Sequence, residues 1–599
     1  MTGERPISDY GLLGDTRTAA LVASDGAMDW LCVPRFDGES LFGRLVGGPD
    51  AGTFRVGPAR PATVLERRYR QHTATLETTW AVGGGRLRLT EAMVAEVSGR
   101  LLPTTLVVRR LSAERAAVDA VVEFDPRLGV RHRRPRVQHR RQTLVCEWGA
   151  LAVALDSTPT VRIEPGRPTP LTVRPDHPVT LVLAVAHREP IVHVEPTAAW
   201  DLLVEDEARW RAWTAEIDER VPFREHVVRS LLTMRLLTYS PSGAPVAAPT
   251  TSLPEDPGGE RNWDYRYVWP RDASIGVSAF LSVGKADEAQ GFLAWLLHAS
   301  RLQRPRLPAL LTLHGRHVPA ERKLDWPGYL GSRPVRVGNA AAGQHQLDGY
   351  GWVIDAAWAF AQSGHRLYAE TWRAVRGFAD VVSQCWPEPD AGIWEVREPA
   401  QHVHSKLMGW LALDRALAIA DTHPLSDRQR RRWQRSRDAI AADVRMRGVD
   451  PAANSYVRTY GSRDLDAALL VLPLLGMDPT DSPRVRGTID AIRDRLSAGG
   501  PLLYRYPPGR DGLPGTEGAF LPCSFWLVQA LARTGRRREA VELFEALVDY
   551  ASPLGLYAEE VDPATGAHLG NYPQTLTHAA LVQAALAIRD APVGDPGSV

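Results

Sequence analysis

The stretch TAAWDLLVEDEARWRAWTAEI, residues 197–217, marks a change in the spacing of apolar residues along the chain. From here onward they recur three and four positions apart, as in amphipathic helices. Before it, short runs such as TLVVRRL (105–111) and AAVDAVVEF (116–124) alternate with period two between Gly, Pro and Asp, which is typical of an antiparallel β-sandwich. The pattern predicts a β-sandwich over residues 1–196, a linker helix over 197–222 and a helical domain over 223–590.

The helical half has room for a large closed fold. Its roughly 365 residues, at usual helix and loop lengths, hold roughly a dozen helices, enough for a toroid of six helical hairpins. No strict repeat supports this count independently. The helices alternate with long loops rich in Gly and Pro that carry Trp, Arg, Asp and Glu, and loops on a rigid scaffold are where functional residues concentrate.

Composition narrows the class of partner. Of 599 residues, 44% are hydrophobic and 24% charged, as in ordinary globular proteins, which excludes a disordered or fibrous chain. Lys and Arg number 71 against 70 Asp and Glu, so no bulk charge draws the chain to nucleic acid or an anionic membrane. We expect a small neutral partner. The 18 Trp and 15 Tyr suit stacking on sugars, although they also suit a core.

Targeting signals and cysteine spacing indicate the compartment. We find no signal peptide at the N-terminus and no run of about 18 apolar residues, so we expect a cytoplasmic protein that does not span a membrane. The four cysteines lie far apart without Cys-x-x-Cys spacing, which disfavours zinc and fits reduced, buried thiols. The basic run RHRRPRVQHRR (131–141) is compatible with anion binding but favours a solvated hairpin, because it lacks aromatics and a glycine-rich cradle.

The first candidate catalytic group is Glu395 in GIWEVRE (392–398), where it directly follows Trp394. An aromatic wall lowers the local dielectric and raises a carboxyl pKa, which suits a general acid. The alternative is that Trp394 caps a helix end and Glu395 points to water. A second carboxylate is available at Glu559, in GLYAEEVDPATGAHLGNYPQTLTHAAL (555–581), before a polar, glycine-rich loop.

A second group of candidates lies in RNWDYRYVWPRDAS (261–274), which surrounds Arg271 and Asp272 with aromatic residues and ends where a helix is predicted to begin. Unpaired Arg and Asp are poorly suited to a core. Side by side at the start of a helix, they offer a donor and an acceptor to the vicinal hydroxyls of a sugar. A purely structural ion pair is the alternative.

Five motifs in order carry a resemblance: RNWDYRYVWPRD, the GNAA and QLDGYG elements of residues 338–351, GIWE, EGAFLPCSFW and EEVDPATGAHLGNYPQTLTH. Together they resemble glycoside hydrolase family 15, the glucoamylase, glucodextranase and bacterial trehalase family. The N-terminal stretch YGLLGDTRTAALVASDGAMDWLCVPRFDGESLFGRLVGG (10–48) is similar to the β-domain of the bacterial trehalase-like members. The resemblance covers nearly the whole chain and implies an (α/α)6 barrel behind an N-terminal antiparallel β-sandwich.

The resemblance also implies roles for particular residues. Glu395 matches the general acid and Glu559 the general base, with Glu560, where many relatives have Gln, as a supporting neighbour. Residues implied to hold the substrate are Trp269, Arg271, Asp272, Gln346, Asp348 and Trp394, of which Gln346 and Asp348 are expected to line the pocket. His345 and His578 are expected to be structural.

The implied chemistry is hydrolysis with inversion, which requires room for a water and a carboxyl separation of roughly 6.5 to 9.5 Å. It requires no metal or organic cofactor. The implied substrate is α,α-trehalose, with α-1,4 or α-1,6 glucosides as the alternative. A catalytically inactive sugar-binding protein is an alternative of another class, disfavoured by the intact carboxylates. A phosphorylase would need a cationic cluster in place of Glu559. A homo-oligomer is compatible with the sequence.

Overall fold

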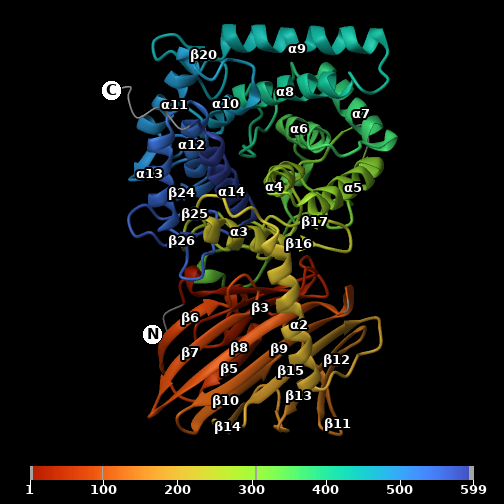
Figure 1. Cartoon of the computed structure of the whole chain (residues 1–599), viewed down its shortest axis with the longest axis vertical. Coiled ribbons are helices and arrows are strands. Elements are labelled where there is room, and N and C mark those ends of the chain that lie inside the picture. Colours follow the sequence, from red (N-terminus) through yellow and green to blue (C-terminus); the bar gives the residue numbers. More distant parts are fainter. Residues whose placement is uncertain (1–4, 98, 304–305, 593–599) are drawn as a thin grey trace.

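Two regions of different architecture follow one another along the chain, a β-sandwich and a ring of helices stacked on it (Figure 1). The computed structural model describes residues 5–97, 99–303 and 306–592. The last strand of the sandwich ends at His187, the helix α2 spans Pro196–Ala215, and the first helix of the ring begins at Arg224.

Two antiparallel sheets form the sandwich. The seven-stranded sheet contains β1 (Gly11–Gly14), β2 (Ala19–Val22), β3 (Ala27–Val33), β4 (Glu39–Phe42), β5 (Thr53–Pro58), β10 (Val118–Asp125) and β14 (Pro168–Val173). The eight-stranded sheet runs in the order β11 (Arg136–Arg140), β12 (Thr143–Trp148), β13 (Leu151–Thr158), β15 (Val179–His187), β9 (Arg100–Glu114), β8 (Gly85–Val97), β7 (Leu76–Val82) and β6 (Thr63–Tyr69). The basic run lies mostly exposed in the β11–β12 hairpin and the segment before it.

Strand β8 shows why the eight-stranded sheet is apolar on both faces. Leu89 and Met93 point into the core between the sheets, whereas Ala92 and Val94 point to the opposite face. Successive side chains of a strand alternate between faces, so each face needs its own cover. The helix α2 supplies the outer cover by packing Leu203 on this second face.

The ring consists of inner and outer helices. The inner ones are α4 (Pro270–Ser282), α6 (Asp348–Gln362), α8 (Val403–Ile419), η5 (Ala467–Val471) continued by α10 (Leu472–Leu475), α12 (Leu521–Arg533) and α14 (Thr575–Asp590). The outer ones are α3 (Arg224–Leu236), α5 (Ala286–Gln303), α7 (Ala369–Cys385), α9 (Asp427–Arg447), α11 (Pro483–Arg495) and α13 (Arg537–Val548). Each inner helix packs against the next, and α14 closes the ring against α4. The predicted (α/α)6 barrel behind a β-sandwich is confirmed.

Burial separates inner from outer helices. Every residue of α12 except Arg533 is buried, as expected for a helix surrounded by protein. The outer helix α9 buries a single stripe that includes Trp433, Ile440 and Val444, which recur at helical spacing. The remaining residues of α9 are largely charged and face solvent.

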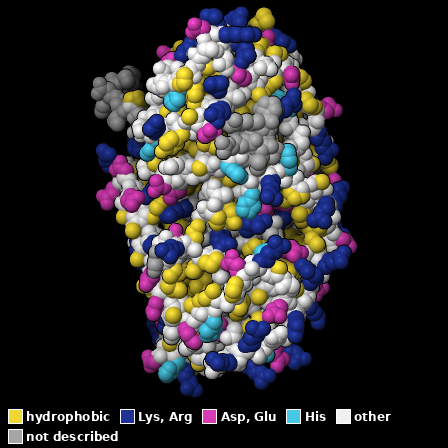
Figure 2. Space-filling view, turned by 90° about the vertical axis from the view of Figure 1, so that its right-hand side faces the viewer, with side chains coloured by type: hydrophobic (Ala, Val, Ile, Leu, Met, Phe, Trp, Pro, Cys, Tyr) yellow, Lys and Arg dark blue, Asp and Glu magenta, His cyan; other side chains and the backbone are white. Residues whose placement is uncertain are grey.

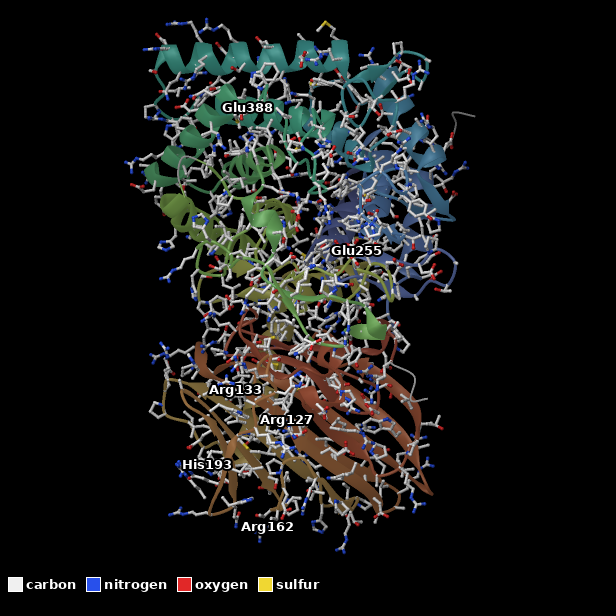
Figure 3. The ribbon with its side chains drawn as sticks, turned by 180° about the vertical axis from the view of Figure 1, so that it is seen from behind. Arg127, Arg133, Arg162, His193, Glu255 and Glu388 are labelled. Atoms are coloured by element: carbon white, nitrogen blue, oxygen red, sulfur yellow. The ribbon has the colours of Figure 1, made fainter. Side chains whose placement is uncertain are left out.

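Loops at one end of the ring rest on the sandwich. The Trp30 indole donates to the Pro249 carbonyl at 2.8 Å, and the Tyr572 hydroxyl donates to the Tyr10 carbonyl at 2.8 Å. One buried apolar cluster continues through both regions. Figure 3, drawn from behind, shows Glu255 in the half of the ring nearer to the sandwich. The loops at this end of the ring therefore have a fixed support.

The surface is mixed in charge. Basic and acidic side chains are interspersed on the face drawn in Figure 2, as the nearly balanced composition leads one to expect. Within the described ranges, every helix is too short or too polar to span a bilayer. The four cysteines are buried and unpaired.

Candidate active site

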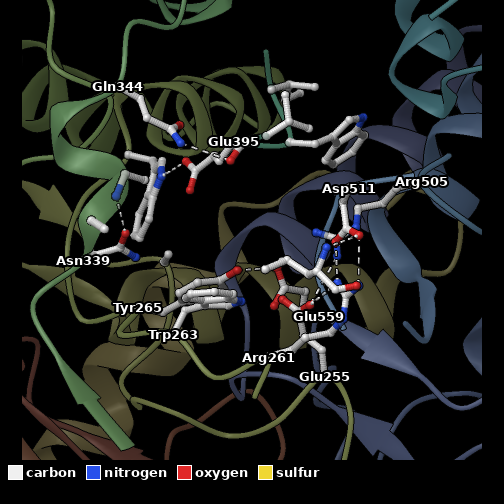
Figure 4. A pocket seen from close by; sticks show the side chains of 18 of the residues that line it. Glu255, Arg261, Trp263, Tyr265, Asn339, Gln344, Glu395, Arg505, Asp511 and Glu559 are labelled. Atoms are coloured by element: carbon white, nitrogen blue, oxygen red, sulfur yellow. Dashed lines mark hydrogen bonds and ion pairs between the residues drawn. The ribbon is translucent and has the colours of Figure 1, made fainter. Parts of the chain in front are cut away.

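A cavity of about 350 Å³ opens at the end of the ring where the inner helices begin. The loops that precede these helices form its walls (Figure 4). Six of the eight residues expected at the site line the cavity: Trp269, Arg271, Asp272, Trp394, Glu395 and Glu559. All of its lining residues come from the helical region, between residues 247 and 576. Five loops widely separated in sequence therefore converge on one site.

Glu395 lies on one wall and is held by donors. The Trp269 indole donates to its Oε1 at 2.6 Å, and the Gln346 side-chain amide donates to the same oxygen at 3.1 Å. Its backbone has a φ of +59°, an uncommon conformation for a residue with a side chain, and Gln344 donates to its carbonyl at 3.1 Å. The structure therefore rules out the alternative in which Glu395 merely points to bulk water.

Trp394, the expected aromatic partner of Glu395, makes its hydrogen bond with another residue. Its indole donates to Asp466 Oδ1 at 2.7 Å, and its ring packs edge-on against Phe520. Trp394 also lines the cavity. The indole that contacts Glu395 itself belongs to Trp269.

Glu559 lies on another wall and is almost fully buried, with 3% of its surface exposed. The Tyr265 hydroxyl and the Gln574 amide donate to its Oε1 at 2.9 and 3.2 Å. Oε2 has no hydrogen-bond partner among the described residues. Burial and, next, the charge of Glu255 raise the pKa of Glu559 to about 8.

A glycine packs closely against this second oxygen. Gly570 has a φ of +75°, and a Cβ there would lie 3.0 Å from Glu559 Oε2. Any side chain would be strained in this conformation and would crowd the oxygen. One oxygen of Glu559 is therefore fixed by two donors, and the other is buried beside Gly570 without a partner among the described residues.

Arg271 and Asp272 begin helix α4 and lie nearly buried at the cavity wall. Arg271 Nε donates to Asp272 Oδ1 at 2.7 Å, and its Nη1 donates to the Ile393 carbonyl at 2.8 Å. The pair therefore connects the α4 loop to the loop that carries Glu395. The pKa of Arg271 is raised by Asp272 and Asp348, although burial alone would lower it, so the guanidinium stays charged.

Gln346 and Asp348 are not among the side chains that line the cavity, contrary to expectation. Gln346 lies behind Glu395 and donates to it. Asp348 is fully buried at the start of α6, where burial raises its pKa to about 7. Its negative charge acts on Arg271. Both residues thus support residues that line the cavity, and a role in binding substrate stays a prediction for them.

The structure also shows an ionic network that the sequence did not reveal. A single nitrogen, Nη2 of Arg505, lies 3.1 Å from both Glu517 and Glu560 and 3.3 Å from Glu255. Arg261 Nη1 lies 2.7 Å from Glu517 and 2.6 Å from Asp511. We call these six residues the ionic network: Arg261, Arg505, Glu255, Asp511, Glu517 and Glu560. Their side chains are 0 to 10% exposed.

Glu560, expected as a supporting neighbour of the base, belongs to this network. It is fully buried, does not line the cavity, and accepts a hydrogen bond from the Gly518 amide at 2.9 Å. His578, expected to be structural, accepts from the Tyr557 amide at 3.3 Å and lies 3.0 Å from the Ser230 hydroxyl. It does not line the cavity.

Family models match both regions of the chain. Residues 221–586 match Glycosyl hydrolases family 15, and residues 2–167 match the family Trehalase-like, N-terminal. The chain is similar to the trehalase of Mycolicibacterium smegmatis, with 37% identity over 97% of this chain and 90% of that protein. The trehalases of Mycobacterium tuberculosis and Thermoplasma volcanium are 35% and 32% identical, over 97% and 98% of this chain and 89% and 94% of those proteins.

A solved structure shares the fold. A bacterial glucoamylase in complex with acarbose matches with a TM-score of 0.73, covering 98% of this chain and 94% of that one, at 14% identity. Similarity at this identity establishes the arrangement of sandwich and barrel. The family match covers more than half of the chain, and the relatives extend over nearly all of it, so this chain belongs to glycoside hydrolase family 15.

Proposed function

We propose that the protein is an inverting, exo-acting α-glucoside hydrolase that cleaves α,α-trehalose into two glucose molecules. The observation that carries the proposal is the placement of Glu395 and Glu559 on different walls of one cavity, each fixed by its own donors (Figure 4). Two carboxylates on either side of a scissile bond supply both proton transfers of hydrolysis. The scheme uses no metal or organic cofactor.

In this mechanism Glu395 protonates the glycosidic oxygen as the bond breaks. Glu559 Oε2 takes a proton from a water that attacks the anomeric carbon from the other face, through an oxocarbenium-like transition state. Tyr265 and Gln574 hold Oε1, so the free oxygen has a defined direction. We expect a carboxyl separation of roughly 6.5 to 9.5 Å, which leaves room for the water.

Arg271 and Asp272 are proposed to hold the hydroxyls of the glucose whose bond is cleaved. Both line the cavity next to Trp269, whose indole contacts the acid. Arg271 has three donors beyond the two hydrogen bonds that fix it. Arg271 and Asp272 can form an ion pair with each other and still bind sugar, an arrangement that we call the sugar clamp. Their pairing fixes both side chains at the cavity wall, where the donors and acceptors that it does not use can bind hydroxyls.

Trehalose is favoured as the substrate because three relatives that align over nearly the full chain are named trehalase. Hydrolysis of α-1,4 or α-1,6 glucosides is the second candidate, and the shared fold of a bacterial glucoamylase keeps it open. A sugar-binding protein without turnover is disfavoured by the complete acid and base positions. The buried, unpaired cysteines support a cytoplasmic location as part of the proposal.

The test is the stereochemistry of the first products. Purified protein is supplied separately with trehalose, maltose, isomaltose and starch, and proton NMR follows the anomers before mutarotation. Inversion predicts equal early amounts of α- and β-glucose from trehalose, because only the attacked residue changes configuration. An early excess of α-glucose would mean retention and would contradict the role of Glu559. Release of glucose only from maltose or starch would replace trehalose by the second candidate.

A further inference from the structure

A β-hairpin crosses from the cavity to the sandwich. Its strands are β18 (Arg322–Leu324) and β19 (Val335–Val337), which pair in antiparallel register. Near its base, Glu321, Lys323 and Arg336 line the cavity. Its tip, residues 325–334, reaches the sandwich and appears in green between the two regions in Figures 1 and 3. One segment therefore contacts both the site and the N-terminal region.

The tip is firmly seated on the sandwich. Trp326 is 5% exposed, its indole donates to the Val130 carbonyl at 3.0 Å, and its ring lies 5.3 Å from the His132 ring. The Gly328 amide donates to the Val46 carbonyl at 3.0 Å, and the Tyr329 hydroxyl donates to the Arg5 carbonyl at 2.8 Å. Figure 3 labels Arg133, the neighbour of His132, in the part of the sandwich nearer to the ring.

Two glycines of the sandwich leave room for this contact. A Cβ on Gly47 would lie 3.3 Å from Trp326 Cε3, and a Cβ on Gly48 would lie 3.0 Å from Pro327 Cγ. Both distances are tighter than ordinary van der Waals contact. The sandwich surface is thus complementary in shape to Trp326 and Pro327.

The two strands of the hairpin differ at the cavity. On β19, the Arg336 guanidinium lies 4.5 Å from the centre of the Trp263 ring, and its Nε donates to Glu321 at 3.0 Å. On β18, Lys323 is exposed, and its ammonium has no hydrogen-bond or ion-pair partner within the described part of the chain. Lys323 therefore offers free donors at the rim, and its position depends on where the hairpin lies.

The inference rests on the proposed function, in which the second glucose of the disaccharide lies beyond Glu395, on the side away from Arg271 and Asp272. Arg397, two residues after the acid, lines the cavity together with Lys323. We propose that Lys323 and Glu321 bind the hydroxyls of this leaving glucose, and that Trp326 is a positioning residue that holds them there by docking the hairpin on the sandwich. The β-sandwich thereby determines recognition of the leaving sugar.

The experiment compares trehalose with α-D-glucosyl fluoride, which has no second sugar. In Trp326→Leu we expect kcat/KM for trehalose to fall by about tenfold, mainly through KM, as when one or two hydrogen bonds to a sugar are lost. Fluoride release from glucosyl fluoride should stay within about twofold, because its leaving group makes no such bonds. Trp213→Leu is the matched control: its indole donates to Glu288 at 2.7 Å and joins α2 to α5 away from the hairpin.

The second variant is Lys323→Met, which alters the rim without touching the domain contact and should show the same selective loss. It keeps the proposal testable if Trp326→Leu does not fold. Equal losses on both substrates in the two variants, or no loss on trehalose, would overturn the proposal. If the wild type cleaves glucosyl fluoride but not trehalose, the proposed function fails instead, and the same comparison is made with the disaccharide that it does cleave.

Discussion

Each region contains a buried group of charged residues, and the two groups differ in their ratio of acidic to basic side chains. In the sandwich, Arg109 and Glu91 are both 0% exposed and form a one-to-one pair, with Arg109 Nε and Nη2 donating to Glu91 Oε2 at 2.8 and 2.7 Å, while Glu91 Oε1 has no partner among the described residues. The other donors of Arg109 bind the carbonyls of Phe54 and Gly26 at 2.6 and 2.7 Å. In the ionic network of the barrel, four carboxylates share two guanidiniums, and Nε of Arg505 has no acceptor.

The two groups differ in their balance of buried charge. A buried pair with one charge of each sign is balanced within itself, and removing one partner leaves the other charge buried and uncompensated. A surplus of buried carboxylates is unfavourable on its own, and it raises the pKa of neighbouring acids. The ionic network extends to the cavity wall, and the charge of Glu255 raises the pKa of Glu559, the proposed base. We therefore expect mutations in the two groups to affect different properties.

The largest effect is expected in the sandwich. Glu91→Gln leaves the Arg109 charge buried without its partner, so the free energy of unfolding should fall by about 3 to 5 kcal/mol. Urea unfolding monitored by tryptophan fluorescence measures this loss, and kcat of the remaining folded protein should be unchanged. A variant that is as stable as the wild type would show that the pair is not structural.

The next effect is expected at the two carboxylates proposed to be catalytic. Glu395→Gln and Glu559→Gln should each lower kcat by at least about a hundredfold, or about 2.7 kcal/mol, since each removes a proton-transfer group. Both variants should unfold at the same urea concentration as the wild type. They should therefore lose turnover and keep stability, whereas Glu91→Gln should lose stability and keep turnover. Near-normal turnover in either one would reject its assignment.

The smallest effect is a shift in pH dependence. Glu559 acts as a base only when deprotonated, so kcat/KM should fall as pH decreases through its raised pKa. Glu255→Gln removes the neighbouring negative charge that contributes to this rise, so the acidic limb of the profile should move to lower pH. The control Glu321→Gln removes another cavity carboxylate and should move the limb less. An unchanged limb, or a shift to higher pH, would contradict the coupling.

Periodicity predicted a β-sandwich followed by a helical region, because each region repeats one pattern many times, and the resemblance to glycoside hydrolase family 15 implied the (α/α)6 barrel. The barrel ring still contains an irregular member that the sequence did not reveal. The run DLDAALLVLPLLG (464–476) has helical spacing, yet the structure forms a 3-10 segment followed by the short helix α10. Pro473 stands in the first turn of α10, where proline is tolerated, whereas a continuous helix would need its missing N–H.

The residues proposed as the catalytic pair and the sugar clamp were identifiable in the sequence, because each lies within a short, distinctive motif. The ionic network was not, because its members are brought together only by the closed ring. Arg505 and Glu255 are 250 positions apart in sequence, and Tyr265 and Glu559 are 294 apart. No local pattern reports such contacts. Trp326 was missed for the same reason, since its partners Val130 and His132 belong to the other region.

The common direction of the inner helices has an electrostatic consequence for the cavity. Each peptide unit has a dipole along the helix axis, so the first turn of an α-helix behaves like roughly half a positive charge. The inner helices α4, α6, α8, α12 and α14 all begin at the cavity end of the ring. Their N-termini together create a positive potential there, which opposes the rise in carboxyl pKa that burial causes. The same carboxylates at the other end of the ring would meet the negative ends of these dipoles, which would raise their pKa further.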